Sequence, residues 1–334
     1  MKSSLTPLLC SLLLLTTSLA QSDVSIATVE VGSTGNAADS RTGWGAVSYT
    51  YHIGTYEVTN AQYTAFLNAK AADDTHGLYH TSMASGGIQR SGSAGSYTYT
   101  LNSGWADRPV SLISYFDAMR FCNWLTNGQG TGDTETGVYN GISTDTLRNA
   151  SAMDNGGFAI ATIDEWYKAA YFDPSLNSGT GGYWLYPSQS DSAPSSTDLA
   201  SNNGANYTPV SDTTPEFGDL RPVGSFANSP SYFGTYDQGG NVWEWTASPT
   251  DGIESQEHIR GGSIYFNYDR MAATFGATTR LPGSELDYLG FRLVATSVSP
   301  VPEPAAVGLS ASLVVGALVC WRRRRSAQST RSRS

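Results

Sequence analysis

The 334-residue sequence is poor in the side chains that most often carry redox and metal chemistry, since it has only three cysteines and four histidines. Only Cys122 lies between the two terminal segments described below. The body of the chain therefore has no cysteine pair for an internal disulfide or for a zinc site of the cysteine type. The histidines are dispersed, which argues against a site built from several imidazoles; they are His52, His76, His80 and His258.

Basic residues are also scarce once the two ends of the chain are set apart. Residues 1–20 and 299–334 contain seven of the 19 lysines and arginines but only one of the 29 acidic residues. The body keeps 12 basic and 28 acidic side chains, a net charge of −16. A surface this acidic repels nucleic acid and anionic lipid, so we expect no nucleic-acid partner.

The first 20 residues have the pattern of a secretory signal peptide. Lys2 precedes an apolar run over residues 8–15, and the small-residue pattern Ser18-Leu19-Ala20 predicts cleavage after Ala20. The apolar run is too short to span a bilayer well. A lipid anchor at Cys10 is not expected, because the preceding Leu9 is too bulky for a lipoprotein cleavage site.

The C-terminal segment, residues 299–325, combines three features in a fixed order. A proline-rich motif precedes an uncharged apolar stretch over 305–321, which is about the minimum length for a transmembrane helix. An arginine cluster follows, and by the positive-inside bias it predicts a cytoplasmic tail at residues 326–334. The residues of the motif and the cluster are Val301, Pro302, Glu303, Pro304, Arg322, Arg323, Arg324 and Arg325.

The motif, the apolar stretch and the arginine cluster resemble the PEP-CTERM sorting signals of Gram-negative bacteria. In that family an exosortase in the inner membrane cuts near the Pro-Glu-Pro motif and passes the protein toward the cell surface. The resemblance implies an exosortase as processing partner and an intermediate held in the inner membrane by the C-terminal helix. It also implies a final location at the cell surface or in the extracellular matrix. The alternative is an ordinary C-terminal membrane anchor.

The body, residues 21–298, is predicted to form one α+β domain with short elements and long polar connections. Alternating polar and apolar residues predict strands over 25–31, 49–57 and 158–162. Apolar residues at helical spacing predict helices over 61–69, 115–125 and 164–171, with Thr59 and Asn60 as caps of the first. Segments rich in glycine and serine predict a hairpin or long loop at 83–103 and an irregular excursion at 175–214.

Seven short motifs rich in aromatic residues and glycine follow one another along this body. They are Y-E-V-T-N-A-Q-Y at 56–63, R-P-V-S at 108–111 with C-N-W-L at 122–125, A-T-I-D-E-W at 161–166, R-P-V-G at 221–224, G-N-V-W-E-W at 240–245, R-G-G-S at 260–263 and G-F-R at 290–292. Together they resemble the formylglycine-generating enzyme, or sulfatase-modifying factor, family. The resemblance implies that family's fold, an α+β domain with little regular secondary structure and a distant relation to C-type lectins.

Active members of that family oxidise a substrate cysteine to formylglycine with a pair of copper-binding cysteines just after the R-G-G-S motif. No cysteine follows Ser263 in this part of the body, and Phe266 and Met271 stand where the thiols are expected. Copper(I) prefers thiolate ligands, which a phenyl ring and one thioether do not provide. We therefore expect neither copper nor the family's oxidase activity. Cys122 is expected to be a buried core residue.

The resemblance also implies bound calcium. The family's first site, carried over to this chain, would take the carboxylates of Asp237 and Glu244 and the carbonyl oxygens of Gly240 and Val242. Calcium prefers six to eight such oxygen ligands. The alternative is that Glu244 pairs with an arginine, either Arg260 or Arg292. A second site, matched less well, would take Asn206, Tyr207 and Asp219.

Without the thiols, the former active-site groove carries side chains that suit recognition. Its candidate residues are Tyr265, Phe266, Asn267, Tyr268 and Arg270, with the loop 279–288 nearby. Aromatic and amide groups suit sugar or peptide ligands. The sequence thus predicts an exported, calcium-stabilised and non-catalytic module that binds an extracellular polysaccharide or a protein. The alternatives are an enzyme of the formylglycine-generating type with altered metal chemistry, and a purely structural surface protein.

Overall fold

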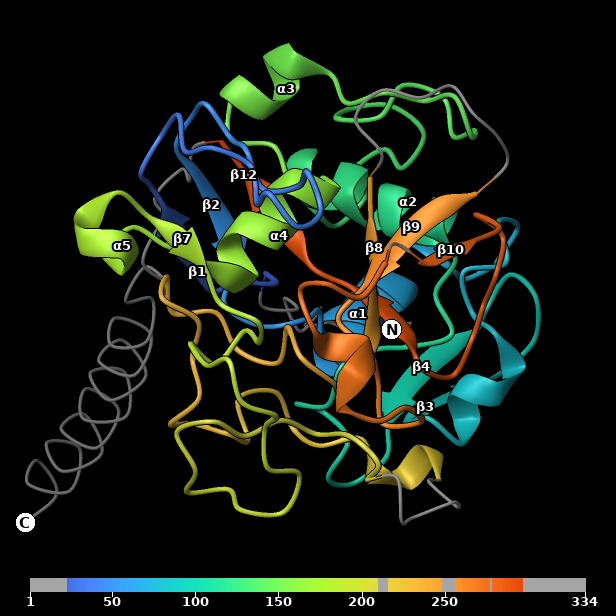
Figure 1. The fold of residues 1–334 in the computed structure, drawn as a ribbon. Helices are drawn as coiled ribbons and strands as arrows, with labels where there is room; N and C mark the ends of the chain where they lie inside the picture. The colour runs from blue at the N-terminus through green and yellow to red at the C-terminus, as the bar shows by residue number, and fades with distance from the viewer. Residues whose placement is uncertain (1–22, 210–215, 248–255, 277, 297–334) are drawn as a thin grey trace, which may run out of the picture. The chain divides into compact units, whose positions relative to one another are not determined.

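Both ends of the domain meet in one antiparallel sheet (Figure 1). A computed structural model describes residues 23–209, 216–247, 256–276 and 278–296. Within them, the first sheet has the strand order β1-β2-β12-β5, so the last strand of the domain lies between two much earlier ones. The strands are β1 (Thr28–Val31), β2 (Tyr51–Gly54), β5 (Ala159–Ile160) and β12 (Leu293–Ala295).

The second sheet carries the G-N-V-W-E-W motif at its centre. Its order is β10-β9-β8-β11, with β8 antiparallel to β9 and parallel to β11. All four side chains of β8 are buried. A single residue, Arg292, separates β11 from β12 and so joins the second sheet to the first. The strands are β8 (Trp243–Thr246), β9 (Glu257–Arg260), β10 (Thr278–Arg280) and β11 (Leu289–Phe291).

Three helices begin at side chains that cap them in the same way. In each, a Ser or Thr hydroxyl accepts from the backbone N–H three residues later, and that residue's side chain accepts from the capping residue in return. This reciprocal capping box satisfies two amide groups that a helix start otherwise leaves unpaired. The helices are α1 (Asn60–Lys70) after Thr59, α2 (Tyr115–Thr126) after Ser114 and α4 (Ile163–Tyr171) after Thr162.

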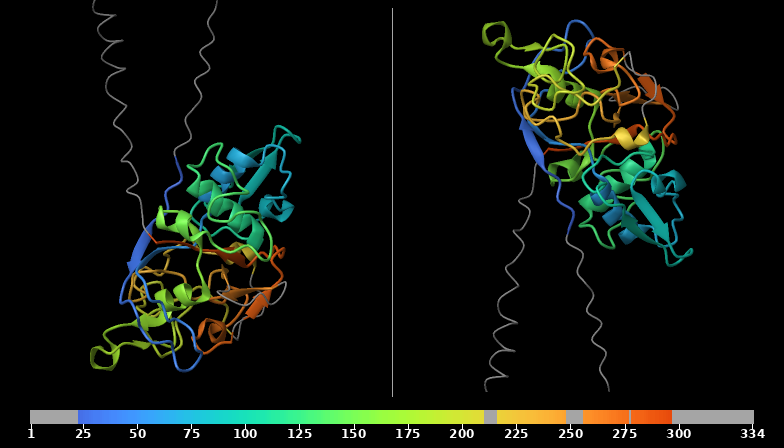
Figure 2. Two further views of the ribbon diagram at one scale, coloured as in Figure 1. Left: turned by 90° about the horizontal axis from the view of Figure 1, so that it is seen from above. Right: turned by 90° about the horizontal axis from the view of Figure 1, so that it is seen from below.

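The remaining elements are short. Figure 2 shows the β3–β4 hairpin grouped with α1 and α2 on one side of the domain. The strand pairs are β3 (Ile88–Ser91) with β4 (Thr98–Leu101) and β6 (Phe172–Asp173) with β7 (Gly182–Tyr183). The short helices are α3 (Ala150–Asp154), α5 (Leu176–Gly179) and the 3₁₀ turns η1 (Thr81–Ala84), η2 (Phe217–Asp219) and η3 (Tyr268–Met271).

Aromatic rings from distant parts of the chain form much of the core. Phe121 of α2 contacts Phe66 of α1 edge-on with a centroid separation of 5.4 Å, and Phe291 of β11 at 5.5 Å. Such edge-to-face contacts add to the free energy gained from burying apolar area. Cys122, on the same helix, is fully buried, which confirms its prediction as a core residue.

The predicted α+β class with little regular structure is confirmed, and the predicted helices begin within one residue of their observed starts. The observed strands are shorter than predicted: β2 ends at Gly54 because the chain then turns to bury Glu57. In the part of the chain that the structure describes, no helix has the length and apolar character needed to cross a membrane. The predicted signal peptide, Pro302-Glu303-Pro304 motif and C-terminal helix lie outside the described residues.

Candidate functional site

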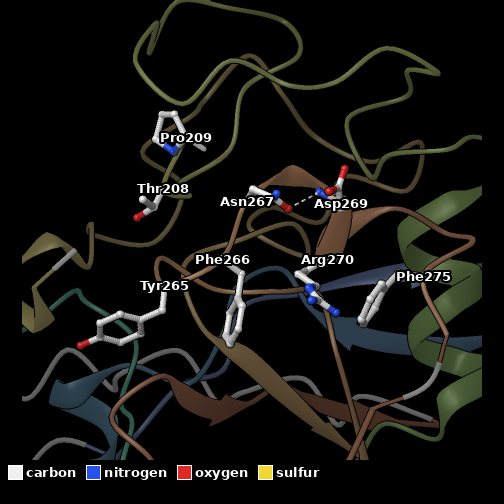
Figure 3. Close-up of a pocket in the computed structure, with 8 residues that line it drawn as sticks. All are labelled: Thr208, Pro209, Tyr265, Phe266, Asn267, Asp269, Arg270 and Phe275. Atoms are coloured by element: carbon white, nitrogen blue, oxygen red, sulfur yellow. Dashed lines mark hydrogen bonds between the residues drawn. The ribbon is translucent and has the colours of Figure 1, made fainter. Parts of the chain in front are cut away.

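A pocket of about 460 Å³ lies where the thiols of the family were expected (Figure 3). The backbone beyond Ser263 forms a tight turn in which Phe266 N–H donates to the Ser263 carbonyl at 3.0 Å. The side chain of Asn267 then caps the turn η3 by accepting from Asp269 N–H at 3.1 Å. The lining residues are Thr208, Pro209, Tyr265, Phe266, Asn267, Asp269, Arg270 and Phe275.

Arg270 is held in this pocket by two aromatic rings. Its guanidinium carbon lies 4.5 Å from the ring centroid of Phe275 and 5.8 Å from that of Phe266. Figure 3 shows the Arg270 side chain between these rings, with the carboxyl group of Asp269 pointing to the opposite side. Cation–π contact orients the guanidinium without using its N–H donors.

Tyr265 and Phe266 form the other wall and contact the predicted neighbouring loop. The Tyr265 hydroxyl donates to Asp287 Oδ2 at 3.0 Å, and its ring contacts Tyr288 edge-on. Burial and the neighbouring Asp287 carboxylate raise the pKa of Tyr265, so this phenol stays protonated at neutral pH. Phe266 packs edge-on against Trp243 of β8 and against Tyr288, which fixes the wall to the second sheet.

Four of the five predicted groove residues share this pocket, namely Tyr265, Phe266, Asn267 and Arg270. Tyr268 does not line it, because its ring packs against Tyr186 and Tyr207 on another side of the turn. Four further residues line the pocket that were not predicted from the sequence, namely Thr208, Pro209, Asp269 and Phe275. Asp269 and Phe275 are close in sequence to the predicted residues, whereas no motif marks residues 208–209.

The two positions expected for thiols are apolar in the structure. Phe266 is part of the pocket wall, and Met271 is 1% exposed and packs with Tyr186 and Ala205. The remaining cysteine of the body, Cys122, is far in sequence from the residues of this pocket. Burial raises the pKa of its thiol, so the thiolate form needed for copper binding is disfavoured.

The four histidines lie apart from one another, with His52 on β2. His76 lies 3.5 Å from Glu135, His80 accepts from Ser82 N–H at 3.2 Å, and the ring of His258 contacts Trp44. Among the residues that the structure describes, no group of three or more His, Cys, Asp or Glu side chains is placed to hold a metal ion.

Arg292 and Glu244 form a fully buried ion pair between the two sheets. Arg292 Nη2 donates to Glu244 Oε1 at 2.9 Å, and Arg292 Nε donates to Oε2 at 3.0 Å. Trp166 Nε1 also donates to Oε2, at 2.7 Å, and further Arg292 N–H groups donate to the carbonyls of Gly54 and Tyr236. The sequence left two possible partners for the Glu244 carboxylate, calcium or an arginine. The structure shows it paired with Arg292.

In this arrangement the two carboxylates of the predicted first calcium site are hydrogen-bonded to protein donors. Both Glu244 oxygens already accept hydrogen bonds, and Asp237 Oδ2 accepts from Gly224 N–H at 2.5 Å. The positive charge among these carboxylates is the Arg292 guanidinium, whose Nη2 also lies 3.9 Å from Glu57 Oε2. Gly240 belongs to the tight turn of the motif, where its φ is 85°.

The residues of the second predicted calcium site form hydrogen bonds between loops. Asn206 Nδ2 donates to the Asp219 carbonyl and to Asn241 Oδ1, both at 3.0 Å. The Asp219 carboxylate instead accepts from Glu216 N–H at 2.9 Å, and the Tyr207 hydroxyl donates to the Pro194 carbonyl at 2.7 Å. Asn206 and Asp219 are thus neighbours, but the three side chains use different partners.

Buried carboxyl groups predict an unusual dependence of stability on pH. Burial raises the pKa of Asp117 to about 7 and that of Asp237 to about 6, and burial with the nearby Asp237 raises the pKa of Glu57. Between about pH 4 and pH 7 the folded protein therefore binds protons that the unfolded chain has released. We expect the free energy of unfolding, measured with urea, to fall as pH rises through this window.

The variant Asp237→Asn should flatten this slope, because asparagine does not titrate and tolerates the positive φ of 60° at this position. The carboxyls whose pKa is lowered, such as Glu165 beside Arg148, act mainly below about pH 4.5 and so oppose the trend only at the acid end of this window. A free energy of unfolding that rises steadily from pH 5 to pH 7 would contradict the prediction.

The motif order, the mixed α/β content and the pocket after the R-G-G-S turn together define a domain of the formylglycine-generating type. The chain belongs to this family, because the model of the sulfatase-modifying factor enzyme 1-like domain matches residues 27–297.

Relatives and solved structures agree with this assignment. The chain is 35% identical over 92 residues to inactive C-alpha-formylglycine-generating enzyme 2 of Bos taurus and 36% identical over 89 residues to that of Mus musculus. These alignments cover 26% and 25% of this chain and only 30% and 29% of the relatives. The crystal structure of CarF shares the fold, with a TM-score of 0.50 and 23% identity over 81% of this chain and 98% of that one.

Proposed function

We propose that the domain is a non-catalytic module that binds an extracellular polysaccharide in the pocket lined by Thr208, Pro209, Tyr265, Phe266, Asn267, Asp269, Arg270 and Phe275. The observation that carries this proposal is that aromatic, amide and guanidinium groups line the pocket where the active family has thiols. Sugar-binding sites commonly combine an aromatic wall with a few polar groups that fix orientation. The word "inactive" in the names of the two mammalian relatives supports a non-catalytic role.

The pocket offers both parts of such a site. Phe266 and Tyr265 supply ring surface, and their positions are fixed by Trp243 and Tyr288 behind them. Asn267 lines the pocket and uses its side-chain oxygen to cap η3, which leaves its amide N–H groups as donors for hydroxyl groups. A rigid wall that already presents free hydrogen-bond donors loses less conformational entropy on binding a ligand than a flexible loop does.

Substitution in the pocket tests this proposal. We expect Tyr265→Ala and Asn267→Ala each to weaken binding of a polysaccharide found by glycan-array screening by tenfold or more, which corresponds to about 1.4 kcal/mol. Tyr232→Ala is the matched control, since Tyr232 is 45% exposed and lies outside the pocket. Titration calorimetry with the purified body, residues 21–298, gives the dissociation constants.

Four outcomes would overturn the proposal. A screen without any polysaccharide ligand, or equal binding by all variants, would remove the pocket as a binding site. Specific binding of a protein alone would place the module in the second predicted ligand class. Stoichiometric copper or iron in the purified body, with turnover of a substrate, would favour the alternative of an enzyme with altered metal chemistry.

We further propose that residues 1–20 direct export of the protein and that residues 299–325 direct its sorting to the cell surface. The signal-like residues 1–20 and the Pro302-Glu303-Pro304 motif with its apolar stretch and arginine cluster support this location. Mass spectrometry of the protein recovered from its producing cells tests it. A mature chain that still begins at Met1 and ends at Ser334 would rule out both processing steps.

A further inference from the structure

The guanidinium of Arg270 has no acidic partner among the described residues, whereas half of the ten arginines in the described part of the domain have one. Five others form ion pairs with carboxylates at 3.1 Å or less, namely Arg41, Arg90, Arg120, Arg148 and Arg292. Arg270 forms no ion pair and no side-chain hydrogen bond with any residue that the structure describes, and it is exposed in a pocket. Its planar donor fork is therefore available to a ligand.

The surroundings of the Arg270 guanidinium indicate which chemical group of a ligand it would bind. An arginine fork matches a carboxylate through two parallel N–H···O bonds, and rings on either side hold it in one orientation. Phe275 and Phe266 are those rings here. A planar carboxylate is thus a ligand group that this guanidinium can bind through two hydrogen bonds.

The other polar groups of the pocket favour a ligand that also carries hydroxyl groups. Asp269 lies next to Arg270 in sequence, but its carboxyl group points away from the guanidinium and accepts no hydrogen bond from described residues (Figure 3). A carboxylate accepts hydrogen bonds from sugar hydroxyls, and the Asn267 amide donates to them. A carboxylate and several hydroxyls on one small ring are the features of a sugar acid.

We propose that the pocket recognises a hexuronate unit of an extracellular polysaccharide, with Arg270 binding its carboxylate. This inference rests on the proposed function and names the class of sugar for the same pocket. The net charge of −16 on the body repels a densely charged polyanion. The matching ligand therefore carries a uronate between neutral sugars, so that one carboxylate reaches Arg270 and few others approach the acidic surface.

A pair of matched oligosaccharides tests the proposal. One is a trisaccharide with a single hexuronate unit, and the other is the same trisaccharide with its carboxyl group reduced to the alcohol. We expect the purified body to bind the acidic form at least tenfold more tightly in titration calorimetry. Arg270→Gln should abolish this preference, whereas Arg280→Gln should keep it, since Arg280 lies on β10 outside the pocket lining. Circular dichroism and melting curves confirm that each variant is folded.

The results distinguish a failure of this inference from a failure of the proposed function. Equal binding of the two trisaccharides, with a loss in Tyr265→Ala, would overturn the uronate assignment and leave a neutral polysaccharide as ligand. An acid preference that survives in Arg270→Gln would also overturn it. Binding of neither trisaccharide together with an empty glycan-array screen would overturn both proposals, as would binding of an acidic peptide alone.

Discussion

The variant Arg292→Met is expected to lower the free energy of unfolding by about 3–5 kcal/mol, the usual cost of removing one partner of a buried ion pair. The substitution would leave Glu244 buried without its cation and remove the positive charge nearest to Glu57. It would also leave the carbonyls of Gly54 and Tyr236 without their donors. Chemical denaturation followed by tryptophan fluorescence measures the loss, and Arg280→Met on β10 is the surface control.

Thermal unfolding with and without a chelator tests whether a bound ion also contributes positive charge beside Arg292. Because the guanidinium already supplies the positive charge among these carboxylates, we expect the melting temperature of the wild-type body to be unchanged by a chelator. A large drop with chelator that calcium reverses would show that the predicted calcium site forms after all. A loss below about 1 kcal/mol in Arg292→Met would contradict the role given to the ion pair.

The variant Gly240→Ala is expected to be nearly as damaging, at about 2–5 kcal/mol, from backbone strain and overpacking together. Gly240 has a φ of 85°, and an added Cβ atom would lie 2.2 Å from the carbonyl oxygen of Asn206. That oxygen accepts from Asn241 N–H at 2.7 Å, so it cannot move without breaking the contact between the two loops. Denaturation curves of the purified body measure the effect.

A second glycine separates the two causes. Gly141 also has a positive φ, 75°, but no atom lies within 4 Å of the position of its missing Cβ. Gly141→Ala therefore reports the backbone strain alone and should cost about 1–2 kcal/mol. Equal losses in the two variants would show that the close approach of Asn206 is not what requires glycine at position 240.

Much of the fold could be predicted from local patterns. Thr59 and Asn60 marked the start of α1 because a cap acts on the amides of the next turn, and the structure has this capping box. The hairpin predicted as one option for residues 83–103 is β3–β4. The pairing of β12 with β2 and β5 could not be predicted from the sequence, since strands of two to four residues carry no signal for partners so far away.

The candidate site was predictable only where it is continuous in the chain. Residues 265–270 follow a recognisable motif, and most of them line the pocket. Residues 208–209 reach the pocket through the hydrogen bond from Thr208 N–H to the Phe266 carbonyl. This contact joins residues 58 positions apart, and no periodic pattern in the sequence predicts it. The choice between calcium and Arg292 as partner of Glu244 likewise depended on how the two sheets join, which is a property of the whole fold.

The position of β12 has a consequence for how the chain becomes a folded protein. This strand ends at Ala295 and lies between β2 and β5, so the first sheet stays incomplete until nearly the whole domain has been synthesised. Contacts between residues so distant in sequence also form slowly. A ribosome-bound or truncated chain that stops before Leu293 lacks an inner strand of that sheet, and the domain therefore folds after synthesis rather than progressively along it.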